Sequence, residues 1–79
     1  MRYVTSIERL AIEEGEIKNS RKNTIDILET RFGNVPESLV EKINSIDKLA
    51  ILETLFRRAI LIESVEAFEQ FLEQTLSAE

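Results

Sequence analysis

Cysteine and histidine are both absent from the chain, and their absence restricts the chemistry that it can perform. Without these residues the chain has no disulfide, no thiolate nucleophile, no Cys/His zinc site and no Ser–His or Cys–His dyad. A disulfide-free composition also fits the reducing cytoplasm. We therefore expect a cytoplasmic protein with no catalytic residues, no metal site and no cofactor.

Long apolar runs and positive charge are also scarce. No stretch approaches the roughly 18 consecutive apolar residues that a membrane-spanning helix needs, and the N-terminus does not resemble a signal peptide. Fifteen acidic residues against ten basic ones give the 79-residue chain a net charge of −5. This charge opposes non-specific attraction to nucleic acid or anionic lipid, so we expect no membrane partner and disfavour nucleic acid.

Glycine and proline are rare, and Gly33 and the single proline, Pro36, lie together near the centre of the chain. A helical apolar pattern runs up to Phe32 and another begins at Leu39. Glycine suits the left-handed residue just past a helix end, and proline suits the first turn of the following helix. The sequence therefore predicts a tight corner between two helices.

The first predicted helix runs from about Ser6 to Phe32, because one apolar stripe follows the helical period over this whole range. The segment Thr5-Ser6-Ile7-Glu8 has the capping-box pattern at its start. A competing interpretation breaks the helix near Asn19–Asn23, where poor helix formers gather and Asn23 or Thr24 would cap a new helix.

Three shorter helices are predicted after the corner, and no segment reads as a strand. The second runs from Pro36 to about Ser45, the third begins near Asp47 as its N-cap, and Ser64 caps the fourth. The third is apolar on most sides and should lie centrally. The expected fold is all-α, a small bundle of about four helices in one domain. Residues 1–32 form a long amphipathic helix, and residues 33–79 form a three-helix segment that packs on it.

The first helix is too long for a compact chain of this size. About 27 residues span ~40 Å, whereas a globule of this length is only ~30 Å across. The N-terminal half should overhang and expose its apolar stripe, which typically marks a partner surface. A second copy is the simplest partner, so we expect a homodimer. The predicted interface comprises Tyr3, Ile7, Leu10, Glu14, Ile17, Arg21, Ile25 and Leu28.

Two opposite charges on this stripe suggest how the two helices are oriented. A parallel pair would place Glu14 against Glu14 and Arg21 against Arg21, which is repulsive. An antiparallel pair centred between Ile17 and Lys18 places Glu14 opposite Arg21 instead. The hypothesis is therefore an antiparallel dimer.

A basic patch of Lys18, Arg21 and Lys22 offers an alternative function, that of a small nucleic-acid-associated regulator. No aromatic or amide group accompanies the patch to stack on bases or to read them. The i,i+4 pairs Glu14–Lys18 and Lys22–Asp26 would account for it as a solvated helix face.

Other charged motifs read as solvated helix faces. Glu16-Ile17-Lys18 matches the letters of a nuclease half-motif, but that chemistry needs a strand and here the triplet lies in a predicted helix. Glu66, Glu69 and Glu73 form an acidic stripe on the outer face of the fourth helix. We therefore expect that the chain is not an enzyme.

Three segments carry a resemblance to a known family. These are Tyr3 to Gly15, Leu28 to Gly33, and Ala67-Phe68-Glu69-Gln70-Phe71-Leu72. With them the chain resembles the C-terminal helical tail, a domain of unknown function, of the Rpn-like, PD-(D/E)XK transposase-related nucleases, which are mostly cyanobacterial. The resemblance implies an accessory helical module in proteins linked to mobile DNA.

The chain departs from that family in two ways. The nuclease core that would precede Tyr3 is missing, so no catalytic residue is carried over. The segment 16–23, often long and rich in glycine and glutamine in such tails, is short here. The chain looks like a stand-alone or excised tail. The expected function is a non-catalytic helical interaction or oligomerisation module.

Overall fold

The computed structural model describes the backbone from residue 6 to residue 78 and the side chains from residue 12 to residue 78. Four helices make up this part of the chain, and it contains no strand. The helices are α1 (Ser6–Phe32), α2 (Glu37–Asn44), α3 (Leu49–Leu61) and α4 (Val65–Ser77). The predicted all-α bundle of about four helices is confirmed.

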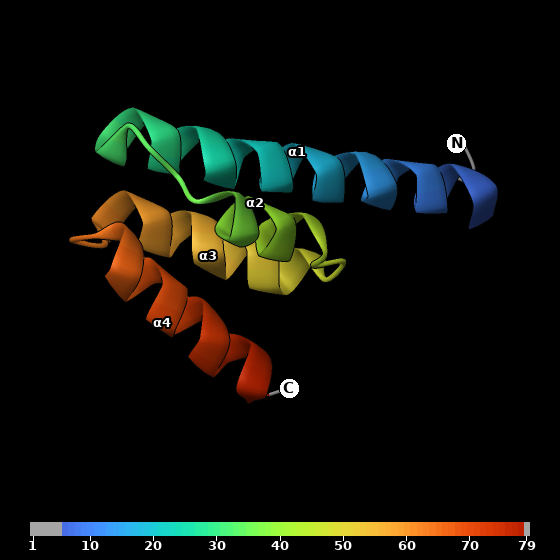
Figure 1. The fold of residues 1–79 in the computed structure, drawn as a ribbon. Helices are drawn as coiled ribbons and strands as arrows, with labels where there is room; N and C mark the ends of the chain where they lie inside the picture. Colours follow the sequence, from blue (N-terminus) through green and yellow to red (C-terminus); the bar gives the residue numbers. More distant parts are fainter. Residues whose placement is uncertain (1–5, 79) are drawn as a thin grey trace.

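Helix α3 occupies the centre of the bundle, as its broad apolar surface predicted. In Figure 1 α1 and α3 lie side by side and run in the same direction, with α2 against them and α4 on the other side of α3. The buried core draws on every helix and on the corner before α3. Its apolar members are Leu28, Leu39, Ile43, Ile46, Leu52, Leu55, Ala59, Phe68 and Leu72.

Helix α1 is continuous through residues 19–23, so the alternative of a break there is wrong. Thr24, which would have capped a new helix, is fully buried and its Oγ1 donates to the Ser20 carbonyl, 2.8 Å away. A threonine hydroxyl that donates to the carbonyl four residues earlier is typical of a position inside a helix and not of an N-cap. Packing on α3 therefore outweighs the poor helix propensity of Asn19, Ser20 and Asn23.

The corner between α1 and α2 forms as the sequence predicts. Gly33 has a φ of 81°, in the left-handed region, and its N–H donates to the Glu29 carbonyl at 2.8 Å. Pro36 lies at the N-cap of α2, where its carbonyl accepts from Leu39 N at 3.0 Å and Val40 N at 3.1 Å. The proline thus opens the helix while lacking the N–H that a later position would need.

The predicted caps of α3 and α4 have different outcomes. Ser64 caps α4, because its Oγ accepts from Ala67 N at 3.1 Å. Asp47 does not cap α3: the N-cap is Lys48, in extended conformation and without a side-chain cap bond. Ile46, at 5% exposure, is buried and fixes the chain just before Asp47. Helix α3 therefore begins one residue later than the preference of aspartate for the N-cap position indicated. The predicted cap at Thr5-Ser6-Ile7-Glu8 lies outside the residues whose side chains are described.

Arg31 ties the end of α1 to the end of α3. Its Nη1 donates to the Ala59 carbonyl at 2.7 Å and to the Ile62 carbonyl at 2.5 Å. These carbonyls lie at the C-terminal end of α3, where intrahelical donors run out. One side chain of α1 therefore fixes which turn of α1 lies beside the last turn of α3.

The two glycines should respond oppositely to alanine. Gly33→Ala forces a Cβ into a left-handed conformation and should destabilise the protein by about 1 kcal/mol. Gly15→Ala, in the interior of α1 with no atom within 4 Å of the added Cβ, should stabilise it by up to about 1 kcal/mol. Urea unfolding of the two variants checks this, and an unchanged midpoint for Gly33→Ala would contradict the left-handed corner.

Candidate interaction surface along α1

The C-terminal half of the predicted dimer stripe packs inside its own protomer. Leu28 is fully buried, and Ile17 and Ile25 are half-buried against the same core. Leu28 therefore has no surface to offer a partner, which corrects its place in the expected interface. The stripe follows one face of α1, but the core of the protomer already covers that face in part from Ile17 onward.

The N-terminal half of α1 continues past the bundle. Figure 1 shows the helix running beyond the ends of α2 and α3, and the molecule measures 47 × 27 × 21 Å along its principal axes. Glu14 is exposed on this half. Ile7 and Leu10 occupy helical positions whose side chains are not described, and Tyr3 lies outside the described residues.

Arg21, which the sequence placed on the dimer seam, has an intramolecular partner. Its Nε donates to the Ile46 carbonyl, 2.8 Å away, in the corner between α2 and α3. The Arg21 side chain is half-buried. Sequence reasoning missed this bond because the two residues are 25 positions apart. The sequence feature that could have indicated this bond is an arginine on an apolar stripe, because a partly buried guanidinium needs hydrogen-bond acceptors.

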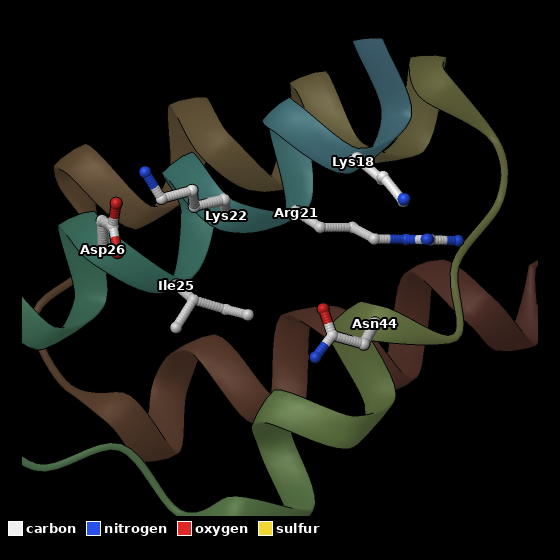
Figure 2. A pocket seen from close by; sticks show the side chains of 6 residues that line it. All are labelled: Lys18, Arg21, Lys22, Ile25, Asp26 and Asn44. Atoms are coloured by element: carbon white, nitrogen blue, oxygen red, sulfur yellow. The ribbon is translucent and has the colours of Figure 1, made fainter. Parts of the chain in front are cut away.

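A groove lies along α1 beside this arginine, and Figure 2 shows the side chains that line the larger of its two hollows. Here an open hollow of about 380 Å³ is lined by Lys18, Arg21, Lys22, Ile25, Asp26 and Asn44. A second hollow of about 230 Å³ is lined by Glu14, Ile17, Lys18, Arg21 and Asp47. The two hollows share Lys18 and Arg21, so they form one track, here called the α1 groove.

The α1 groove combines an apolar floor with a rim of mixed charge, because Asp26, Glu14 and Asp47 line it beside the three basic residues. Ile17 and Ile25 supply apolar surface, and Lys18 and Lys22 are exposed above it. In Figure 2 Lys18 and Arg21 extend from α1 in one direction and Lys22 in the other, toward Asp26, while Asn44 lies on α2. The structure therefore brings the three residues of the predicted basic patch together on one concave surface.

The local ion pairs that were expected to neutralise this patch do not form. Among the described side chains, an ion pair joins Lys42 Nζ to Glu73 Oε1, 3.6 Å apart on α2 and α4, and none joins Lys18 or Lys22 to Glu14 or Asp26. Lys18 and Lys22 thus form no ion pair with Glu14 or Asp26, contrary to the sequence-based expectation. Direct ion pairs with these two carboxylates therefore do not neutralise Lys18 and Lys22.

The remaining sequence candidates do not gather into a site. Within the described part of the chain no three His, Cys, Asp or Glu side chains lie close enough to hold a metal ion. Glu66, Glu69 and Glu73 lie on α4, with Glu73 paired to Lys42, and Glu16 lies in α1 with no strand beside it. None of the described helices is long and apolar enough to cross a membrane.

Comparison with known proteins identifies no relative of this chain. No protein-family model matches the chain, and neither curated proteins nor solved structures give a significant match. The geometry of α1 and its groove is therefore the basis for any functional proposal.

Arg21 and Lys18 should differ in their effect on stability, although both line the groove. Arg21→Met removes a charge-assisted bond to the Ile46 carbonyl and should lower the free energy of unfolding by about 1–2 kcal/mol. Lys18→Met removes an exposed ammonium and should change it by less than about 0.5 kcal/mol. Equal effects of the two substitutions in urea unfolding would show that the Arg21 bond does not hold the corner.

Proposed function

We propose that this chain is a non-catalytic helical module that forms a homodimer through α1. The supporting observation is the mismatch between α1, with 27 residues, and α3, with 13, which it covers in the bundle. The resemblance to the accessory tail of transposase-related nucleases points the same way. In such a protein, the module would set the oligomeric state or dock a partner.

The overhang supports self-association because it leaves helical backbone without a packing neighbour. Isolated helices gain most of their stability from an apolar face packed on something else. The positions of Ile7 and Leu10 continue the stripe that farther along packs on α3. A second copy related by a twofold axis would cover both overhangs at once, which is the commonest form of oligomer.

The runner-up is a small nucleic-acid-associated regulator that uses Lys18, Arg21 and Lys22. The observation in its favour is that these side chains share one groove without neutralising ion pairs. Asp26 lines the same groove, Asp47 and Glu14 line its continuation, and the net charge is −5. Carboxylates at these places would repel phosphates, so the dimer is the preferred function.

Light scattering on a size-exclusion column, across a dilution series, tests the proposed dimer. We expect about 18 kDa, twice the 9.1 kDa chain mass. Leu10→Asp, on the stripe of the overhanging half, should shift the protein to monomer at least about tenfold earlier in dilution, because a buried unpaired charge is costly. Ile12→Asp is the matched control: Ile12 lies on the opposite face, 54% exposed, and should leave the dimer intact.

The opposite result has a clear meaning. A wild-type chain that elutes as a 9.1 kDa monomer at every concentration would refute the dimer. Retention on heparin that salt abolishes, and that Lys18→Glu with Lys22→Glu removes, would then favour the nucleic-acid regulator. Loss of the dimer in both aspartate variants would indicate an effect on α1 itself rather than on one face.

A further inference from the structure

We propose that the α1 groove is the seat of the N-terminal half of α1 from a second copy of this chain. This inference rests on the proposed dimer and adds the surface that the partner's helix occupies. In an antiparallel pair each copy places its overhang in the other's groove, so each groove is complete only in the dimer. The groove, rather than the fully buried Leu28, then carries the contact.

Charge complementarity within α1 identifies the occupant. The stretch 8–16 of α1 carries four glutamates against one arginine. The stretch 18–26 carries three basic residues against one aspartate, and all four line the groove, which Glu14 and Asp47 also line. An antiparallel pair brings the acidic stretch of one copy to the basic stretch of the other, whereas a parallel pair would place like charges together.

The groove has the length and the floor that a helix requires. From Asp26 to Glu14 it follows α1 for about 18 Å, or about three helical turns. Ile25 and Ile17 provide apolar contact along the way, which is the usual mode by which an amphipathic helix binds in a groove. The second hollow opens beside the overhanging half, so the track is continuous with the surface left uncovered there.

Arg21 is positioned in advance for an acidic occupant. Its Nε is held by the Ile46 carbonyl, so the guanidinium lies fixed across the groove at the point where the two hollows join. A guanidinium with Nε engaged still has terminal N–H groups for a carboxylate. A partner helix centred between Ile17 and Lys18 brings its Glu14 to this arginine. Holding the side chain before binding reduces the entropy lost on association.

Charge exchange between the two halves provides the test. Glu14 and Lys18 are both exposed and form no ion pair, so their reversal should leave the protomer folded. Glu14→Lys alone and Lys18→Glu alone should each raise the dimer Kd about tenfold at low salt, because the twofold axis repeats the repulsion. Mixed in equal amounts, the two variants should form more heterodimer than the statistical half, because only the heterodimer keeps the wild-type contact of Glu14 with Arg21 and Lys18 at one of its two ends.

The same substitutions in one chain supply an internal control. Glu14→Lys combined with Lys18→Glu keeps the net charge at −5 and should lower the Kd below that of either single variant, because each introduced lysine then lies within about one turn of an introduced glutamate of the partner. Glu66→Lys, on α4 and exposed, makes the same charge change as Glu14→Lys far from the groove and should leave the Kd unchanged. Circular dichroism and native mass spectrometry report folding and heterodimer content.

The outcomes separate this inference from the proposed dimer. A wild-type dimer whose Kd is unaffected by either reversal would overturn the groove as the seat and leave the dimer standing on another face. A wild-type monomer would remove both. Because the chain has no cysteine, single-cysteine variants also report orientation. Glu14→Cys should crosslink with Lys18→Cys in the mixture more than with itself, and the reverse preference would indicate a parallel pair.

Discussion

The structure depends on covering the apolar face of α3. Leu52, Leu55 and Ala59 are fully buried, so this face of the 13-residue helix has to be covered, whereas Glu53, Thr54 and Arg57 are exposed on the other face. Helix α1 covers one side and α4 another. Two arginines of α1 then fix the alignment, since Arg21 bonds to the corner before α3 and Arg31 to its last turn. With both ends tied, the extra length of α1 falls at its N-terminal end.

The same alignment places Arg21 in the α1 groove. Its Nε donates to the Ile46 carbonyl in the corner after α2, and the larger hollow lies beside this bond. Lys18, about one turn before Arg21, and Lys22, the residue after it, also line this hollow. A fold-stabilising bond and a candidate binding surface therefore share one side chain, which is why removal of Arg21 is a poor probe of the surface.

Local sequence signals predicted most of the fold because the elements here obey local rules. The corner at Gly33 and Pro36, the cap at Ser64 and the central place of α3 follow from residue conformations and periodicity. The burial of Leu28 and the bond of Arg21 could not be predicted from local signals, because both depend on which turn of α1 packs beside α3. A stripe on a long helix shows which face is buried, but the packing partner decides where intramolecular contact ends and free surface begins.

The parallel course of α1 and α3 has an electrostatic consequence. The backbone dipoles of two helices that run side by side in the same direction repel, and their negative C-terminal ends lie together. Arg31 belongs to the last turn of α1 and donates to the terminal carbonyls of α3. Its positive charge therefore stabilises the negative dipole ends of both helices. Arg58 in the last turn of α3 adds a second. The bundle thus concentrates basic side chains where its two longest adjacent dipoles end, although the chain as a whole is acidic.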